Sequence, residues 1–258
     1  MSVSDWDAEK YSRVASPQQE WAEGVLGRLD LRGDEAVLDA GCGSGGVTEL
    51  LLELLPRGTI VAVDGSPAMV EAASKRIDDP RVSFSCQDLT DLELADPVDR
   101  VFSNATFHWV SDHRKLFARL FAALKPGGRI SAQCGGAGNV ADLVEALRTV
   151  TTEAPFRETV GTMDEPWNFA TPEQTRSRLR ESGFEVVDCW LEERRATPDD
   201  PQEFLEASGL SPYRERLAPD QFRAFSDRLM EVMGWPEGFD YVRLNIEATR
   251  PKEATRNE

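Results

Sequence analysis

The sequence predicts an α/β fold in which a mostly parallel sheet has helices on both of its faces. Two observations support this prediction. Residues 36–46 read AVLDAGCGSGG, a short apolar run followed by a glycine-dense turn, and the helical pattern VTELLLELL comes directly after it. Apolar runs rich in β-branched residues then keep alternating with helical patterns as far as residue 135. Such alternation is typical of parallel strands joined by crossover helices.

The elements follow one another in a regular order. Strands are expected at 36–39, 59–64, 81–88, within 99–107, and at 129–135, 184–193 and 240–250. Helices are expected at 17–29, 47–55, 68–77, 116–128 and 171–184, and in parts of 137–160 and 198–239. Ser66 and Pro67 form a helix start, because serine is a common N-cap and proline is favoured at the first helical position.

Composition limits the classes of function. The chain has 258 residues and a formal net charge of −17, and no run rich in lysine and arginine stands out. A surface of this charge repels phosphate backbones and anionic membranes, so neither nucleic acid nor membrane is expected as a partner. The four cysteines and two histidines show no metal-ligand spacing, and no metal is expected. The absence of an apolar leader predicts a cytoplasmic protein with reduced thiols.

The glycine-dense turn fits two patterns of ligand-binding loop. Gly41, Gly43 and Gly46 match G-x-G-x-x-G, the dinucleotide fingerprint, whereas Gly41, Gly43 and Gly45 match G-x-G-x-G. Asp39 favours the second pattern. A carboxylate at this position would repel the pyrophosphate of a dinucleotide, but it suits a ligand such as S-adenosylmethionine, which has an ammonium and a sulfonium and no phosphate.

Two more carboxylates end the next two strands. Asp64 follows Gly41 by 23 residues, where a carboxylate can accept both ribose hydroxyls of a nucleoside. Met69, one helical turn further on, can pack against the adenine or simply fill the helix core. Asp88 ends the third strand, and ligands of open α/β sheets bind at these carboxyl ends. The alternative role is a helix N-cap or a solvated turn for Asp64, and a helix cap for Asp88.

The run LDAGCGSGG resembles motif I of the class I S-adenosylmethionine-dependent methyltransferases. The resemblance implies a Rossmann-like, seven-stranded sheet whose last strand is antiparallel, with a helical cap inserted before that strand. It also implies that Asp88 accepts from the adenine amino group, next to a backbone N–H that contacts the ring edge. The cofactor residues expected on this basis are Tyr11, Asp39, Gly41, Gly43, Gly45, Asp64, Gly65, Ser66, Met69, Gln87, Asp88, Leu89 and Asn104.

Three further segments resemble the small-molecule carboxylate methyltransferases of the trans-aconitate and juvenile-hormone-acid type. They are the N-terminal WD-x-x-x-Y, the loop FHWVSDH and the run LEASGLSPYRERL. The resemblance implies that Gln18, seven residues after Tyr11, holds the substrate carboxylate together with Trp109, and that His108 also belongs to the catalytic group. The alternative is that Trp109 is a packing residue and that His108 fixes its loop by a hydrogen bond.

No arginine clamp for a polycarboxylate stands out in the sequence. The candidates are Arg157, Arg194, Arg214 and Arg243, and a surface salt bridge is the simpler interpretation of each. The resemblance divides the chain into N-terminal lid helices at 1–30, a cofactor-binding core at 31–197, a helical cap at 198–239, and the last strand with the tail at 240–258.

The expected reaction is O-methylation of a small carboxylic acid. A carboxylate is ionised at neutral pH and needs no general base, whereas a hydroxyl or nitrogen acceptor must lose a proton. For a hydroxyl, nitrogen or carbon acceptor, His108 would be the base. Two other functions stay open: an NAD(P)-dependent oxidoreductase, and a cofactor-binding protein without transferase activity. The oligomeric state is not predicted.

Overall fold

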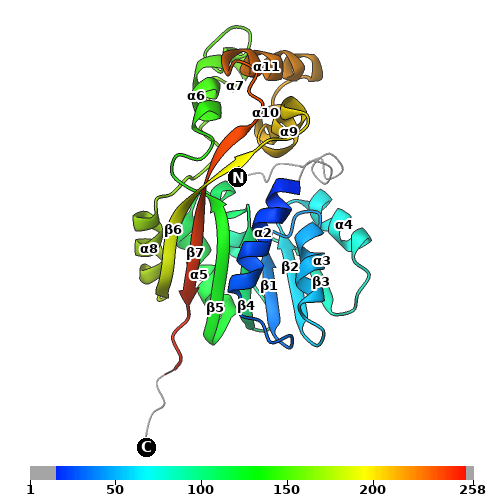
Figure 1. Ribbon diagram of the computed structural model, residues 1–258, viewed down its shortest axis with the longest axis vertical. Helices are drawn as coiled ribbons and strands as arrows, with labels where there is room; N and C mark the ends of the chain where they lie inside the picture. The colour runs from blue at the N-terminus through cyan, green and yellow to red at the C-terminus, as the bar shows by residue number, and fades with distance from the viewer. Residues whose placement is uncertain (1–15, 254–258) are drawn as a thin grey trace, which may run out of the picture.

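The computed structural model describes the backbone of residues 16–253 and the side chains of residues 21–253. A seven-stranded sheet forms the lower body of the molecule, and a helical cap lies above it (Figure 1). The strands are β1 Ala36–Ala40, β2 Thr59–Asp64, β3 Val82–Cys86, β4 Val98–Asn104, β5 Leu124–Gly135, β6 Glu185–Ala196 and β7 Phe239–Thr249.

Helices cover both faces of the sheet and build the cap. Those of the lower body are α2 Ser16–Arg28, α3 Gly46–Glu53, α4 Pro67–Arg76, α5 His113–Ala123 and α8 Pro172–Glu181, with the short 3-10 helices η1 Leu89–Asp91 and η2 Phe107–Trp109. Those of the cap are α6 Ala141–Val150, α7 Arg157–Val160, α9 Pro201–Ser208, α10 Ser211–Arg214 and α11 Pro219–Val232.

The strand order is β3-β2-β1-β4-β5-β7-β6. Strand β7 pairs antiparallel with both of its neighbours, and the other pairs are parallel. The predicted sheet with an antiparallel last strand is therefore confirmed. The chain moves outward from β1 to β3, and then returns to place β4 on the other side of β1. Ligands of open α/β sheets bind at such a switch point, beyond the carboxyl ends of the strands.

Strand β1 shows why the apolar run at its start forms a central strand. Val37 and Leu38 are both fully buried, but they lie in different core clusters. Val37 packs with residues of α2 and α3 on one face, and Leu38 packs with residues of α5 on the other. Successive side chains of a strand point to opposite faces, so a strand covered on both sides requires a continuous apolar run.

The start of α4 has the predicted cap. The Oγ of Ser66 accepts a hydrogen bond from the backbone N–H of Met69 at 3.3 Å, and Pro67 occupies the first helical turn. This cap satisfies a backbone donor that a helix start leaves without an intrahelical partner. It also fixes where the chain turns after β2. This turn matters for the site because Asp64, a predicted cofactor residue, is the last residue of β2.

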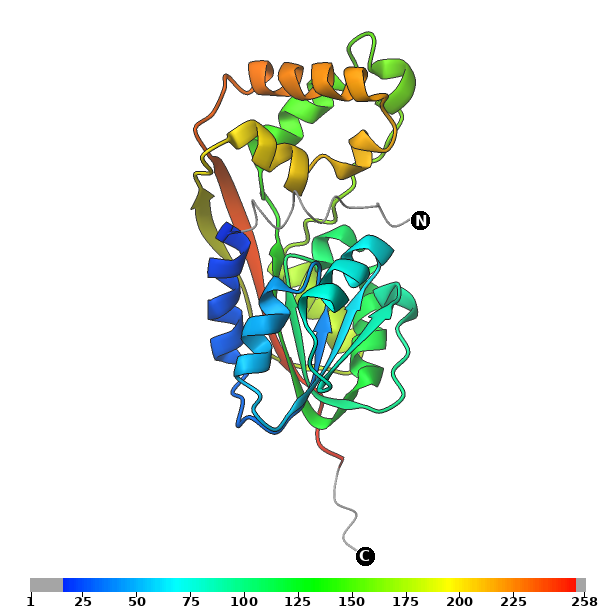
Figure 2. The same cartoon turned by 90° about the vertical axis from the view of Figure 1, so that its right-hand side faces the viewer.

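The cap is built from two separate segments of the chain. Helices α9, α10 and α11 fall within the predicted insertion at 198–239, and Phe225 and Leu229 of α11 are fully buried, as its apolar stripe predicts. Helices α6 and α7 come from the chain between β5 and α8, and their buried residues join the same cluster. Strands β6 and β7 extend beyond the other strands to reach the cap, which lies over the strand ends (Figures 1 and 2). No helix within residues 16–253 is long and apolar enough to cross a membrane.

Candidate active site

The glycine loop after β1 turns sharply beside the loop after β4. Gly41 has a φ of 89°, and its N–H donates to the carbonyl of Val63 at 2.7 Å. A Cβ at Gly41 would collide with the side chain of Thr106, so this position requires glycine. A Cβ at Gly43 would meet nothing within 4 Å. The loop is therefore tightly packed at Gly41 and faces open space at Gly43.

Asp64 is held against this loop by backbone hydrogen bonds. One carboxylate oxygen accepts from the N–H of Gly43 at 3.0 Å, and the other accepts from the N–H of Ser66 at 2.9 Å. Burial raises the pKa of Asp64, and these backbone donors lower it in part. A carboxylate oxygen has room for more than one donor, so Asp64 can still accept hydrogen bonds from a ligand.

Asp39 is the most deeply buried carboxyl of the site, with 1% of its surface exposed. Its Oδ2 accepts from the hydroxyl of Thr48 at 2.7 Å, which ties the end of β1 to the first turns of α3. Burial raises the pKa of Asp39 to about 7, and the nearby charge of Asp64 acts in the same direction. Two carboxyls that are costly to ionise together favour a cationic ligand.

The turn after β3 is stabilised by hydrogen bonds of its own side chains. The carboxylate of Asp88 accepts from the N–H of Thr90 at 2.8 Å and caps η1, so the cap role considered for Asp88 is confirmed. Asp88 is exposed, and its adenine contact stays a prediction. The side-chain amide of Gln87 binds the hydroxyl of Ser85 at 2.8 Å and the N–H of Glu93 at 3.0 Å. Gln87 therefore uses its side chain to close the turn.

His108 lies in η2, directly after β4. Its Nδ1 accepts from the N–H of Gly135 at 3.2 Å, and its backbone carbonyl accepts from the N–H of Asn168 at 2.7 Å. Burial lowers the pKa of His108 well below 6.5, and the charge of Arg243 lowers it further. Because the Gly135 N–H can only donate, the neutral ring bears its hydrogen on Nε2. The loop-fixing role considered for His108 is confirmed.

Comparison with known proteins places the chain in a family. A family model described as a methyltransferase domain matches residues 37–128. Over 220 residues the chain is 31% identical to trans-aconitate 2-methyltransferase of Variovorax paradoxus. This match covers 84% of each of the two chains. The chain belongs to the class I S-adenosylmethionine-dependent methyltransferases. The enzyme is thus a methyltransferase whose cofactor is S-adenosylmethionine, and the oxidoreductase alternative is set aside.

Two further comparisons are consistent with this assignment. Over 139 residues, 53% of this chain and 51% of the relative, the chain is 33% identical to malonyl-[acyl-carrier protein] O-methyltransferase of Priestia megaterium. Among solved structures, phosphoethanolamine N-methyltransferase 2 of Haemonchus contortus, in complex with S-adenosylhomocysteine, matches with a TM-score of 0.62 and 20% identity. This match covers 95% of this chain and 57% of the other, and at that identity it supports the fold.

Four aromatic side chains, from η2 and from the segment before α8, pack against one another. We call His108, Trp109, Trp167 and Phe169 the aromatic wall. Trp167 stacks on Phe169 with ring centroids 5.4 Å apart, and Phe169 stacks on His108 at 5.8 Å. Trp109 lies tilted against both His108, at 5.3 Å, and Trp167, at 5.8 Å. The sequence analysis missed Trp167 and Phe169, because their segment, PWNF, has neither a helical nor a strand pattern.

The four candidate arginines have different surroundings. Arg194 pairs with Glu192 at 2.6 Å and Arg214 approaches Glu206 at 3.6 Å, so the salt-bridge interpretation is confirmed for both. Arg157 is exposed. For Arg243 the surface interpretation is wrong, since only 2% of this residue is exposed. Helix α2 covers it: the Arg243 guanidinium lies 5.2 Å from the ring centroid of Trp21, and Arg28 of the same helix binds Asn245 of β7.

The remaining predicted site residues have varied placements. Met69 and Leu89 are buried apolar residues that pack in the core, and Asn104 is the last residue of β4. Tyr11 lies outside the described residues. Gln18 lies in the first turn of α2, but its side chain is also outside the described part of the chain.

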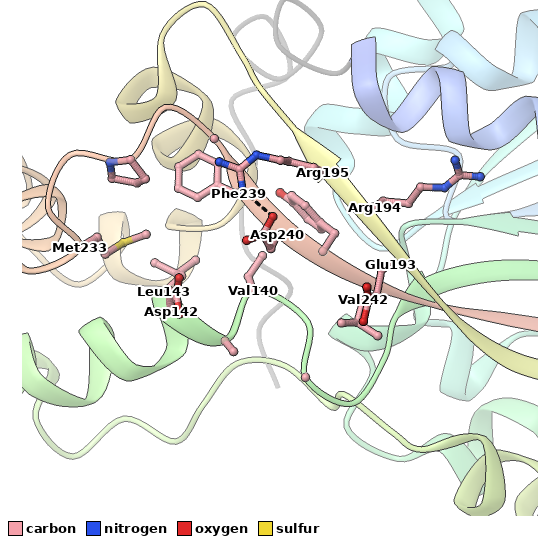
Figure 3. A pocket seen from close by; sticks show the side chains of 15 residues that line it. Val140, Asp142, Leu143, Glu193, Arg194, Arg195, Met233, Phe239, Asp240 and Val242 are labelled. Atoms are coloured by element: carbon pink, nitrogen blue, oxygen red, sulfur yellow. Dashed lines mark hydrogen bonds and ion pairs between the residues drawn. The ribbon is translucent and has the colours of Figure 1, made fainter.

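A cavity of about 590 Å³ lies at the neck between the sheet and the cap. It is lined by the start of α6 and by the ends of β6 and β7 that reach the cap, and Arg195 and Asp240 form an ion pair of 2.6 Å there (Figure 3). The loops after β1, β2, β3 and η2 do not line this cavity. Tyr241, which lines this cavity, packs its ring against that of Trp21 in α2 at 5.1 Å.

Proposed function

We propose that this methyltransferase transfers a methyl group to a carboxylate oxygen of a small organic acid. The observation that supports this most directly is the state of His108. His108 lies in the FHWVSDH loop after β4, burial lowers its pKa well below 6.5, and its Nδ1 already accepts from the Gly135 N–H. A carboxylate is ionised without assistance, so this reaction needs no base. The names of the two relatives, a trans-aconitate and a malonyl-carrier methyltransferase, agree with an acid as acceptor.

The same observation weighs against a hydroxyl or nitrogen acceptor that depends on His108. A general base must offer a lone pair to the proton that it removes. In the tautomer that the Gly135 hydrogen bond selects, Nε2 has a hydrogen and Nδ1 is occupied. His108 can therefore donate a hydrogen bond toward an anionic acceptor, but it is poorly placed to take a proton.

The cofactor site is proposed at the ends of β1 and β2. S-adenosylmethionine supplies an electrophilic methyl group on a positively charged sulfur. Asp64, held in place by the amides of Gly43 and Ser66, is positioned to accept the ribose hydroxyls. The open space at Gly43 lets the ligand approach the backbone closely. Asp39 acts through charge, because a nearby cation lowers the cost of ionising a buried carboxyl.

Some of the other predicted cofactor residues are proposed to bind the cofactor directly, and others to hold the binding residues in place. Asp88 is exposed and keeps further acceptor positions for the adenine amino group. Ser66 and Gln87 are proposed as supports, since Ser66 caps α4 and donates to Asp64, and Gln87 closes its own turn. The roles of Gly65, Leu89, Met69, Asn104 and Tyr11 remain proposals from the resemblance alone.

The acceptor is proposed to lie against the aromatic wall, under the cap. Indole has an N–H donor and no acceptor, so Trp109 can stabilise a carboxylate that Gln18 also binds. Transfer from a sulfonium is an in-line displacement, so alignment and exclusion of water are the main tasks of the protein. The stacked rings of Trp167 and Phe169 would provide an apolar surface for that purpose.

The proposal is tested with Gln18→Ala and Trp109→Phe on a panel of acids that includes trans-aconitate. Each change should lower methyl transfer by on the order of tenfold to a hundredfold, which corresponds to about 1.5–3 kcal/mol for a hydrogen bond to a charged group. Affinity for S-adenosylmethionine, measured by calorimetry, should stay nearly the same. Trp235→Phe is a matched control, because Trp235 is 55% exposed and lies outside the aromatic wall. Full activity of both variants on every acid would exclude this acceptor site.

A further inference from the structure

The backbone carbonyl of Phe107, at the start of η2, accepts two hydrogen bonds. One comes from the N–H of Val110 at 3.0 Å and closes the 3-10 turn that contains His108 and Trp109. The other comes from the ring of His113, whose Nε2 lies 2.8 Å away. The hydrogen bonds of a 3-10 helix have poor geometry, so a second donor on this carbonyl helps to define the turn.

The ring of His113 is itself held from α8. His113 is the first residue of α5, it is 3% exposed, and its ring tilts against that of Phe117 with the centroids 5.8 Å apart. Its Nδ1 lies 3.1 Å from Nη1 of Arg178 in α8. Within residues 21–253 this guanidinium forms no ion pair with a carboxylate. Carboxylates are the usual partners of arginine, so a bond to a histidine ring suggests a particular role.

These two neighbours determine which ring nitrogen of His113 bears the hydrogen. A guanidinium can only donate, so Nδ1 is the acceptor of the ring, and a carbonyl can only accept, so the hydrogen is on Nε2. Burial lowers the pKa of His113, and the charge of Arg178 lowers it further, whereas the hydrogen bond to Phe107 and the charge of Asp112 raise it in part. His113 is therefore a neutral ring that bears its hydrogen on the nitrogen facing η2.

Helix η2 also contacts the glycine loop of the proposed cofactor site. The hydroxyl of Thr106, the N-cap of η2, lies 3.3 Å from the carbonyl of Gly41. The carbonyl of Thr106 accepts from the N–H of Trp109 at 2.9 Å. Trp109 thus lies one hydrogen-bonded turn away from the glycine loop. The orientation of this turn sets the position of Trp109 relative to the cofactor, and an error of about 1 Å in such a position can cost a methyl transfer much of its rate.

Other supports of the loop bind different atoms. Asn168 binds the carbonyl of His108 through its backbone N–H at 2.7 Å and that of Ser111 through its side-chain amide at 2.9 Å. Within the described part of the chain, the side chain that binds the carbonyl opening the turn is that of His113.

We propose that His113 is a positioning residue for methyl transfer, which acts through the carbonyl of Phe107 to orient Trp109, and that Arg178 keeps the His113 ring in the required tautomer. This inference rests on the proposed function, which places the acceptor against Trp109. Neither His113 nor Arg178 needs to contact a ligand, because each acts through a hydrogen bond that the structure already contains.

Steady-state kinetics tests the positioning role. His113→Leu removes the donor but keeps an apolar side chain against Phe117, and it should lower kcat/KM for the acceptor on the order of tenfold. His113→Gln places an amide N–H close to the position of Nε2 and should restore most of that loss. Affinity for S-adenosylmethionine, measured by calorimetry, should stay nearly the same in both variants, because neither change removes a cofactor contact.

Arg114→Gln is the matched control. Arg114 of α5 forms an ion pair with Glu181 of α8, so it joins the same two helices, but neither side chain binds His113 or Phe107. This variant should keep the kcat/KM of the wild type. If His113→Leu fails to fold, as judged by circular dichroism, Arg178→Met replaces it in the comparison. An equal loss in the control, or a His113→Gln variant that recovers no activity, would show that these contacts only stabilise the fold and would overturn the inference.

A spectroscopic measurement tests the role of Arg178 without any acceptor. The chain has two histidines, so protein with isotope-labelled histidine gives two sets of ring signals in NMR, and His108→Asn assigns them. The His113 ring of the wild type should be neutral, with its hydrogen on Nε2, at neutral pH. Arg178→Met should raise the pKa of His113 and let the other tautomer appear, because it removes a nearby positive charge and the donor to Nδ1. Ring signals that this change leaves as they are would contradict the inference.

These tests separate the inference from the proposed function. The kinetic comparison uses whichever acceptor the enzyme methylates, whether or not the product is a methyl ester. A product methylated on nitrogen or carbon would remove the proposed function, and a loss in His113→Leu that His113→Gln reverses would still support the positioning role. A methyl ester formed equally well by wild type and His113→Leu would keep the proposed function and overturn the inference.

Discussion

We expect Asp39 to make cofactor binding and stability depend on pH in opposite directions. Its pKa is raised from 3.8 to about 7 by burial, so the folded protein keeps a proton that the unfolded chain loses. Stability should therefore fall as the pH rises through the window between these values. At about 1.4 kcal/mol for each pH unit of difference, the cost of Asp39 is about 2 kcal/mol at pH 5 and about 4 kcal/mol at pH 8.

Asp39→Asn removes this titration but keeps an oxygen that can accept from Thr48. Relative to the wild type, the variant should gain about 2–3 kcal/mol of unfolding free energy between pH 5 and pH 8. Urea denaturation at both pH values measures it, and Asp34→Asn, at an exposed position, is the control. The variant should also bind S-adenosylmethionine more weakly at pH 8, because it lacks the charge. A shift that is absent, or that favours the wild type at pH 8, would refute the reasoning.

Two more predictions concern single residues of the site. Asp64→Ala should weaken S-adenosylmethionine binding by about 1.5–3 kcal/mol for each charge-assisted hydrogen bond that is lost, and calorimetry on the folded variant checks this; unchanged affinity would remove Asp64 from the ribose. His108→Asn retains an acceptor for the backbone amide of Gly135, and kcat at saturating cofactor should stay within about tenfold of the wild type. Loss of a general base would instead cost about a hundredfold to ten-thousandfold, and that result would favour a hydroxyl or nitrogen acceptor.

The parts of the fold that depend on local pattern were predictable from the sequence. The apolar run of β1, the helix start at Ser66-Pro67 and the glycine loop each depend on neighbouring residues, and the structure has all three. The apolar stripe of α11 similarly indicated a buried helix face. In each case the physical cause, a strand buried on both faces or a capped helix end, acts within a few residues.

The features that the sequence analysis missed depend on contacts between distant segments. Helices α6 and α7 join the cap because their apolar faces meet α11, and no local pattern indicates that partner. The alternation in β7 places Arg243 on a polar face that would normally meet water. Helix α2 covers that face, so Arg243 is buried instead of forming a surface ion pair. Trp167 and Phe169 join the aromatic wall only because the fold brings them to His108.

The position of the transferred methyl group tests the central proposal most directly. The enzyme is incubated with the acid panel and with S-adenosylmethionine that carries an isotope-labelled methyl group, and the product is identified by mass spectrometry and NMR. Carboxylate methylation predicts a methyl ester that alkaline hydrolysis cleaves, releasing the label as methanol. A label that survives this treatment on nitrogen or carbon would contradict the proposal.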